Sequence, residues 1–468
     1  MTEEERESND ITEKQIEEIA KGLPEFGRFG KELETIGILP IPNKMRNFSA
    51  WKLFIFWAMA SASATTPLIG DLLYNMGLKW AIVAMFLGLA LGIAPTWLFS
   101  EMGRQMPLTA LVVARKTFGY GTAQALSVLY TVINVGWFAL NNAVGAEILS
   151  SITHSSIYIW YVAMGVIQIL LVLFGAKWLE YFYRFTSPIL IASYAVLAYY
   201  LVTTYHVNWG ALFAGSPNPF TLNWGNAVGL VLAFGMLSWA YKTTTTSRFG
   251  KPYDGFSWSY GLATPLGIFL PILLMGILGY AGQHYAGNWN IAALSYGVAP
   301  AWVIAASLGA SLAIIHTNAM NLYPSTIDLL VAVDPLIKRR EGFKARLLQP
   351  TTTAALGIAA VLTSIFILSY VNDFLNLVGD AIFPLTFILI FDWYLRLRGR
   401  VNMKEFYDVP RSAADHVKLG AVVSFIVGIA LIYALPEIAP TIFNYVPALY
   451  VGPLIGGLLY AAMIKARK

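Results

Sequence analysis

Lysine and arginine are distributed along this chain in a way that strongly constrains its fold. Long apolar stretches recur, each of about the 20 residues that a helix needs to cross a bilayer. When the stretches are threaded alternately across a membrane, all of the 31 Lys and Arg residues except Lys79 fall on one side. Cytoplasmic loops of helical membrane proteins retain positive charge. The sequence therefore predicts a polytopic membrane protein with both termini in the cytoplasm.

Composition supports this class and argues against others. Hydrophobic residues make up 57% of the 468 positions and charged residues 12%, whereas a soluble chain carries about 25% charged residues. The net charge of +5 is expected to be topological, which argues against a nucleic-acid partner. The absence of Cys excludes disulfides and thiolate metal ligands. No Walker loop or nucleophile motif indicates an enzyme, and no cofactor is expected.

Twelve spans account for the apolar stretches. They follow a tail, residues 1–50, which we expect to be cytoplasmic and to have no catalytic role. The predicted spans cover residues 51–75, 80–102, 121–150, 156–174, 179–204, 225–247, 258–284, 301–332, 351–370, 374–395, 416–435 and 441–464.

The first and sixth spans carry residues that interrupt a helix. Pro67 removes a backbone donor and clashes with the preceding turn, and residues 235–246 are rich in small, β-branched and hydroxyl side chains. Irregular backbone at membrane depth is tolerated where it is buried in protein or lines a wet cavity. Taken singly, each feature is equally explained by an ordinary kink or a Thr-rich helix end. Their offset of five spans favours the substrate site of an inverted-repeat transporter.

Span three carries two amides and an aromatic ring on one helical face. Asn134, Trp137 and Asn141 stand at positions i, i+3 and i+7. The amides offer donors and acceptors, and the indole offers a flat stacking surface, which together suit a planar heterocycle with hydrogen-bonding edges. The alternative is that the amides join helices to one another.

Two ionisable residues inside spans are open to a functional interpretation. His316 lies deep in span eight, where it either carries a proton or packs as a neutral, hydrogen-bonded ring. Lys242, in the inner half of span six, is either a buried cation or a side chain that reaches the inner surface along its stem. We favour the second interpretation of Lys242.

Taken in order, several short segments resemble nucleobase:cation symporter family 1, the purine–cytosine permeases and hydantoin transporters. The resemblance extends from about residue 34 to the end of the chain. The matching segments are 34–42 (ETIGILPIP), 114–119 (ARKTFG), 134–138 (NVGWF), 248–250 (RFG), 317–323 (TNAMNLY), 374–377 (FLNL) with Pro384, and 392–394 (DWY).

This resemblance implies an all-α fold of twelve transmembrane helices, in a five-plus-five inverted repeat like that of the leucine transporter, with two additional C-terminal helices. The first repeat would cover residues 51–206 and the second 223–397, followed by a linker and the last two helices in 398–468. It implies a substrate held between spans one, three, six and eight, with Trp137 stacked on its ring. The implied substrate-binding residues are Ala62, Ser63, Asn134, Trp137, Asn141, Ser238, Trp239, Asn318 and Asn321.

Sodium-coupled members hold their ion with oxygens of spans one and eight. The matching positions here are Ala58, Ser61, Ala313, His316 and Thr317. His316 stands where those relatives place Ser or Thr, and an imidazole is a poor ligand for a hard cation. Sodium and proton both remain candidate coupling ions, and His316 tips the expectation mildly toward the proton.

The expected function is cation-coupled import of a nucleobase, cytosine or a purine, by alternating access at the plasma membrane. Alternatives are transport of hydantoin, allantoin or another small planar heterocycle, an amino-acid transporter of the same architecture, and a ligand sensor that does not transport. The expected partners are the heterocyclic substrate and the lipid bilayer. The sequence carries no motif that fixes an oligomeric state.

Overall fold

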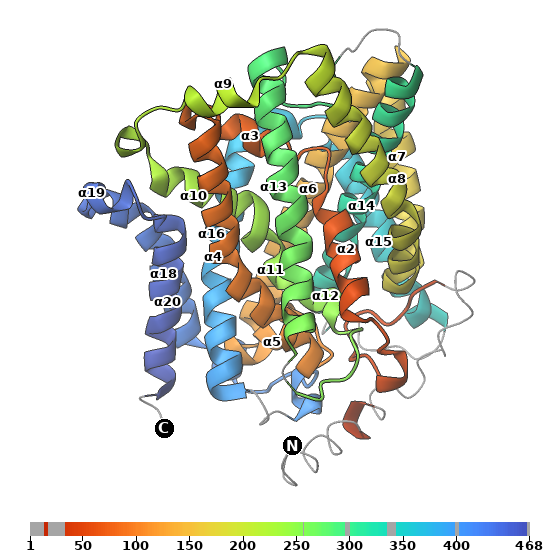
Figure 1. Ribbon diagram of the computed structural model, residues 1–468. Helices are drawn as coiled ribbons and strands as arrows, with labels where there is room; N and C mark the ends of the chain where they lie inside the picture. The colour runs from red at the N-terminus through yellow and green to blue at the C-terminus, as the bar shows by residue number, and fades with distance from the viewer. Residues whose placement is uncertain are drawn as a thin grey trace.

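The computed structural model describes residues 14–16, 33–255, 257–294, 300–334, 343–397 and 402–465. Over these residues the regular structure is helical (Figure 1). Within that part of the chain, eight helical regions are long and apolar enough to cross a bilayer. Their helices are α4 (Leu78–Gln105), α6 (Tyr120–Thr153), α8 (Gly175–Thr204), α13 (Trp258–Ala286), α14 (Pro300–Val333), α16 (Val371–Asp392), α18 (Leu419–Ile438) and α20 (Ala448–Lys465).

The other four predicted spans lie outside this set of eight. Span four is α7 (Ile157–Leu173) and span nine is α15 (Phe343–Thr363). Span one consists of α2 (Ala50–Ser61) and α3 (Leu68–Leu72). Span six consists of α10 (Trp224–Leu232), η4 (Ala233–Leu237), α11 (Ser238–Ala240), η5 (Tyr241–Thr243) and α12 (Thr244–Ser247).

Helix packing repeats between the first five spans and the second five. In span one, α2 packs on α8 of span five and on α13 of span seven. In the same way, span six packs on α16 of span ten and on α4 of span two. Likewise α6 packs on α7 as α14 packs on α15, and α6 and α14 pack on each other. Because five is an odd number of spans, the two sets enter the membrane from opposite sides, as an inverted repeat requires. Spans eleven and twelve, α18 and α20, lie at one edge against α16 (Figure 1).

Span one is interrupted as predicted, although not at Pro67 itself. Helix α2 ends at Ser61, and Pro67 is the residue from which α3 starts. The second half is held against α13 by an approach that only glycine allows. A Cβ atom on Gly279 would lie 1.9 Å from the carbonyl oxygen of Pro67, and one on Gly70 would lie 2.2 Å from that of Gly276.

Span six is irregular but is not broken by an extended segment. It passes through a π turn at η4 and a 3₁₀ turn at η5. Four consecutive threonine hydroxyls, from Thr243 to Thr246, each donate to the carbonyl oxygen three residues earlier, at 2.6–3.1 Å. Hydroxyls bonded back in this way compete with the helix ladder and bend it. The Thr-rich run therefore shapes the helix without interrupting it.

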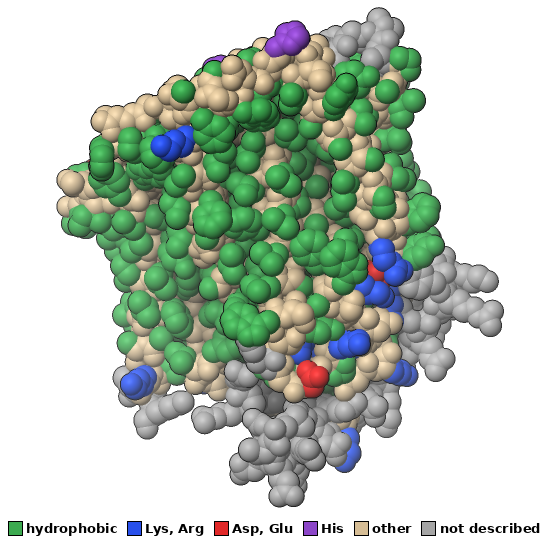
Figure 2. All heavy atoms as spheres, viewed as in Figure 1, with side chains coloured by type: hydrophobic (Ala, Val, Ile, Leu, Met, Phe, Trp, Pro, Cys, Tyr) green, Lys and Arg blue, Asp and Glu red, His purple; other side chains and the backbone are tan. Residues whose placement is uncertain are grey.

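Basic residues gather toward one end of the bundle, which we call the basic end (Figure 2). Here a strap segment, residues 33–49, is bonded to several spans. Phe48 exchanges backbone hydrogen bonds with Phe249 and Lys251, and the Arg46 guanidinium donates to the carbonyl oxygens of Gly250 and Arg104. The part of the predicted tail that the structure describes beyond residue 32 is thus integral to the fold.

Short helices complete the chain, and some element boundaries differ from the prediction. Helix α5 (Ala110–Thr117) was not predicted, and α15 begins at Phe343 rather than residue 351 because hydropathy does not register its charged first turns. The remaining short elements are η1 (Asn43–Met45), η2 (Tyr74–Met76), α9 (Trp209–Ala214), η3 (Pro219–Thr221), η6 (Ile367–Tyr370), η7 (Trp393–Leu397), η8 (Met403–Phe406), α17 (Ala413–His416) and α19 (Pro440–Phe443).

Candidate functional site

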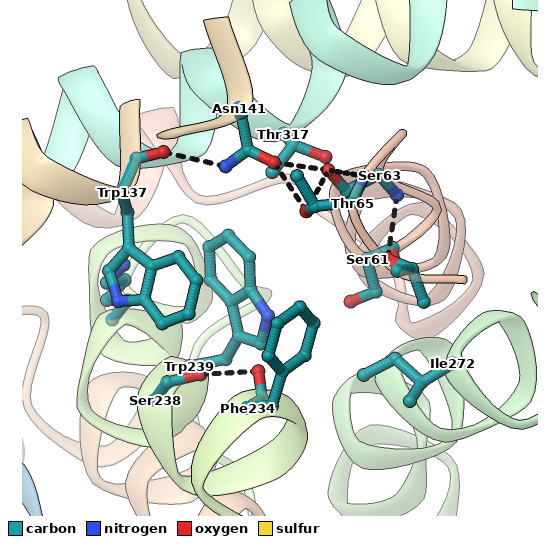
Figure 3. Close-up of a pocket in the computed structure, with 12 residues that line it drawn as sticks. Ser61, Ser63, Thr65, Trp137, Asn141, Phe234, Ser238, Trp239, Ile272 and Thr317 are labelled. Carbon is teal, nitrogen blue, oxygen red and sulfur yellow. Dashed lines mark hydrogen bonds between the residues drawn. The ribbon is translucent and has the colours of Figure 1, made fainter. Parts of the chain in front are cut away.

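A pocket lies where span one is interrupted. Its walls come from spans one, three, six, seven and eight. Seven of the residues singled out from the sequence line it. The lining residues are Ser61, Ser63, Thr65, Thr66, Trp137, Asn141, Phe234, Ser238, Trp239, Lys242, Ile272 and Thr317 (Figure 3).

Hydroxyl groups stabilise the interruption of span one. Ser63 Oγ and Thr65 Oγ1 both donate to Asn141 Oδ1, at 2.5 and 2.7 Å. Thr66 Oγ1 donates to the carbonyl oxygen of Ser61 at 2.8 Å. These bonds replace backbone bonds that the interrupted helix lacks, and they fix span one to span three. Asn141 is thereby a structural partner of the interruption as well as part of the pocket wall.

Three aromatic rings line another side of the pocket (Figure 3). Trp137 meets Phe234 edge-on, with ring centroids 5.7 Å apart, and meets Phe374 edge-on at 5.3 Å. Trp57 meets Trp239 in an edge contact, with ring centroids 5.6 Å apart. Aromatic rings fixed in this way at a pocket wall can contact a planar ligand.

Lys242 enters the pocket wall from span six. Its side chain is 1% exposed, so the expectation that it reaches the inner surface is wrong. The ammonium lies 4.4 Å from the centre of the Trp239 ring and donates to Asn321 Oδ1 at 2.9 Å. It also interacts electrostatically with Asp328, which is buried. A deeply placed charge with these partners marks a functional position in a membrane protein.

Three of the predicted amides support the pocket from outside its lining. Asn134 Nδ2 donates to Tyr241 Oη at 2.8 Å and to Asp328 Oδ2 at 3.1 Å. Asn318 Nδ2 donates to the Phe138 carbonyl oxygen at 3.0 Å, which joins α14 to α6, and its own amide oxygen accepts from Asn321. The alternative role as connections between helices therefore describes Asn134 and Asn318 well. Ala62, at the C-terminal cap of α2, is also outside the lining.

The five positions matched to an ion site differ in whether they face the pocket. Ser61 and Thr317 face the pocket, and Thr317 Oγ1 donates to the Ala60 carbonyl oxygen at 2.7 Å. The carbonyl oxygen of Ala58 accepts from the Ala62 amide at 3.1 Å. Ala313 is fully buried.

His316 is directed toward span five rather than into the pocket. Its Nε2 lies 2.7 Å from Thr186 Oγ1, and its ring lies against Tyr183 and Phe182, with centroids 4.5 and 5.4 Å away. Its backbone carbonyl oxygen accepts from Tyr183 Oη. The side chain is fully buried and is not among the pocket residues.

Sequence reasoning did not assign five of the lining residues to the site. Thr65 and Thr66 directly precede Pro67, and this part of span one was considered only for its interruption of the helix. Lys242 was noted and placed incorrectly. Phe234 and Ile272 carried no signal, because an apolar residue within a span has the same pattern whether it faces lipid, core or ligand.

Comparisons place this chain among known proteins. Residues 40–454 match the model of a family described as permeases for cytosine/purines, uracil, thiamine and allantoin. The hydantoin permease of Microbacterium maritypicum is 22% identical over 75% of this chain and 74% of that protein. The purine-cytosine permease fcyB of Emericella nidulans is 26% identical over 53% of this chain and 49% of that protein.

A solved structure supports the same fold. Mhp1, described as a nucleobase-cation-symport-1 family transporter in a closed conformation with bromovinylhydantoin bound, has a TM-score of 0.76 to this chain. It is 18% identical and covers 93% of this chain and 95% of its own. This likeness confirms the predicted fold of twelve helices with an inverted repeat.

Proposed function

This chain belongs to the family of permeases for cytosine/purines, uracil, thiamine and allantoin, and from that premise we propose that it imports a small planar heterocycle by cation-coupled alternating access. The observation that carries this proposal is the pocket at the interruption of span one, where the Trp137 and Trp239 rings lie beside hydrogen-bonding groups. A flat ligand with polar edges is the chemistry that such a wall recognises. The hydantoin and purine-cytosine permeases among its relatives favour a nucleobase or hydantoin-like ring.

In this proposal the basic end faces the cytoplasm, both termini are cytoplasmic and the protein lies in the cell membrane. Residues 51–206 and 223–397 form the two repeats, and 398–468 add the linker and the last two helices. Alternating access would come from rocking of spans one, two, six and seven against the rest. This division is supported by the packing of α2 and span six on α13 and α4, and by the separate packing of α6 on α14.

Trp137 and Trp239 would stack on the ring, while Asn141, Ser63 and Ser238 would approach its edges from the pocket wall. Asn321 would act through its bond to Lys242. The remaining matched residues, Ala62, Asn134 and Asn318, would position the backbone and the helices around the substrate.

Concentrative uptake tests this function. We would measure cytosine uptake into proteoliposomes, first under an inward sodium gradient at equal pH and then under a proton gradient. The panel would extend to purines, hydantoins and allantoin. Gradient-dependent accumulation of a heterocycle is expected, and a complete lack of uptake and counterflow across the panel would overturn the proposal.

The same measurement separates the rival functions. Competition by free amino acids would support an amino-acid transporter of this architecture. Binding of a heterocycle without counterflow would support a sensor that does not transport. The aromatic pocket argues against the first, because amino-acid sites of this type aim a half-helix N-terminus at a carboxylate.

The coupling ion is tested at His316. The resemblance matches His316 to a position where sodium-coupled members carry Ser or Thr. An imidazole offers no oxygen to sodium, and here it is turned toward Thr186. His316→Thr is expected to create or strengthen sodium dependence of uptake. Thr186→Val, which removes the ring's partner and leaves the matched positions intact, is the control. Identical ion dependence in His316→Thr and the parent would show that His316 only packs.

A further inference from the structure

The pocket contains buried hydrogen-bond donors that the protein itself does not use. Among the described residues, the Trp137 indole Nε1 and Ser61 Oγ have no hydrogen-bond partner, and both residues are buried and line the pocket. Lys242 has three N–H groups and donates one of them, to Asn321. Buried donors left without a partner are costly, so each of these groups favours a ligand or water that accepts.

Most of the hydrogen-bond acceptors in the same pocket wall already have partners within the protein. Asn141 Oδ1 already accepts from two hydroxyls, which uses both of its lone-pair directions. The lining residues include no carboxylate. The hydroxyls of Ser238 and Thr317 donate their protons to backbone carbonyls, so only weak hydroxyl lone pairs remain to receive a donor. The free donors of the described lining therefore include an amine and an indole N–H, whereas its free side-chain acceptors are hydroxyl lone pairs.

Asp328 lies near this wall without entering the pocket. Its carboxyl group accepts from Asn134 Nδ2 and Tyr241 Oη, at 3.1 and 3.4 Å, and is absent from the lining. The carboxyl group is therefore not placed to accept from a substrate amino group in the pocket. The ionisable side chain that a ligand in the pocket would contact is therefore Lys242.

Building on the proposed function, we propose that Lys242 is a specificity residue that selects oxo-substituted heterocycles over amino-substituted ones. A ring carbonyl or a deprotonated ring nitrogen would accept from the Lys242 ammonium and from the Trp137 indole or Ser61 hydroxyl. An exocyclic amino group at the same place would set donor against donor and leave the ammonium unpaired. Sites built around buried polar groups reject analogues that cannot pair with them far more strongly than apolar pockets do.

Matched pairs of nucleobases test this selection. Uracil and cytosine differ by a carbonyl or an amino group on the same ring, as do hypoxanthine and adenine. Equilibrium binding of the four would be measured by calorimetry on the purified full-length protein. The oxo member of a pair is expected to bind about tenfold or more tightly than its amino partner. Lys242→Met should bring that ratio close to one.

Two further variants make the result decisive. Lys251→Met places the same change on an exposed lysine at the basic end and should keep the parent ratio. Lys242→Met combined with Asp328→Asn removes both ionisable groups, so it retains a test if the single variant fails to fold. Cytosine or adenine binding as tightly as its oxo partner in the parent, or an unchanged ratio in both Lys242 variants, would overturn the selection while leaving the transporter in place. Failure of every heterocycle to bind, hydantoin and allantoin included, would instead remove the proposed function.

Discussion

Replacing Trp137 by Ala is expected to weaken heterocycle binding by well over tenfold. Trp137 lines the pocket from span three, and its ring is fixed by edge contacts to Phe234 and Phe374. Stacking of an aromatic side chain on a base contributes roughly 1–3 kcal/mol in nucleic-acid binding proteins. The substitution also removes the indole N–H donor and the preorganised ring surface. The total loss of binding free energy is therefore expected to exceed the contribution of stacking alone. Calorimetry with the tightest ligand of the uptake panel would measure the change.

Two further variants serve as controls for the effect of Trp137→Ala. Trp137→Phe keeps a ring and removes the indole N–H, so it should retain part of the affinity and separate stacking from hydrogen bonding. Trp258→Ala removes an exposed tryptophan at the start of α13 and should leave affinity unchanged. If Trp137→Ala binds as the parent does, the ring does not stack there, and the aromatic wall would have to act through Trp239 or Phe234.

Much of the fold could be predicted from the sequence because the bilayer imposes simple rules. Backbone groups in lipid must be bonded within the segment, so each apolar stretch had to be a helix, and loop charge gave the threading. Pro67 marked the interruption of span one for the same reason. Helix α5 could not be found this way. Its residues Leu111 to Ala114 are buried, but eight residues between basic side chains cannot be distinguished from a loop by hydropathy.

The site was less accessible to sequence reasoning because it depends on side-chain direction. The spacing of Asn134, Trp137 and Asn141 correctly put them on one helical face. That face extends beyond the pocket, so not all of its residues contact the pocket. Trp137 and Asn141 line the pocket, whereas Asn134 reaches Asp328 one or two turns further along. The direction of Lys242 depended on a partner in span eight, Asn321, that is 79 residues away in the chain.

His316 shows the same limit. Its depth in span eight was evident, but a helix residue can turn either toward the pocket or toward a neighbouring span. The ring turns to span five, where Tyr183 and Thr186 receive it. Nothing in the spacing of span eight specifies that contact, which depends on two residues more than 100 positions earlier.

The strap segment joins several spans at the basic end through a single side chain. Glu34 Oε1 accepts from Tyr323 Oη at 2.8 Å and from Gln349 Nε2 at 3.1 Å, while its Oε2 accepts from the Ala176 amide at 2.8 Å. The carboxylate approaches so closely that a Cβ on Gly175 would lie 1.9 Å from it. One buried side chain of the strap therefore joins spans five, eight and nine.

Arg248 extends this network to span six. Its guanidinium donates to the Gly37 carbonyl oxygen at 3.0 Å and to Tyr323 Oη at 3.0 Å, and it is fully buried. The Tyr323 hydroxyl thus passes a hydrogen bond from Arg248 to Glu34. Alternating access would require span six to separate from span eight at this end, and these bonds would have to break. The network is therefore expected to oppose opening of the basic end.

Replacing Arg248 by Met should destabilise this arrangement by about 1–3 kcal/mol, because the buried Gly37 carbonyl oxygen and Tyr323 hydroxyl lose their hydrogen-bond donor. The chain contains no Cys, so a single Ser325→Cys provides a reporter without background. Ser325 is fully buried, lies one turn from Asn321 on α14, and donates its hydroxyl to the Thr131 carbonyl oxygen of span three. Faster maleimide labelling at this position, together with a lower thermal unfolding midpoint, is the expected result.

The size of the effect should follow the chemistry of the side chain. Arg248→Lys keeps the charge but loses the fork that reaches Gly37 and Tyr323 together, so it should fall between Met and the parent. Arg411→Met, on an exposed arginine of the same end, should change neither labelling nor unfolding. Labelling that stays slow in Arg248→Met while the unfolding midpoint falls would mean that Arg248 stabilises the fold without gating it. Equal labelling and equal stability in all three variants would show that the strap does not close the basic end through this network.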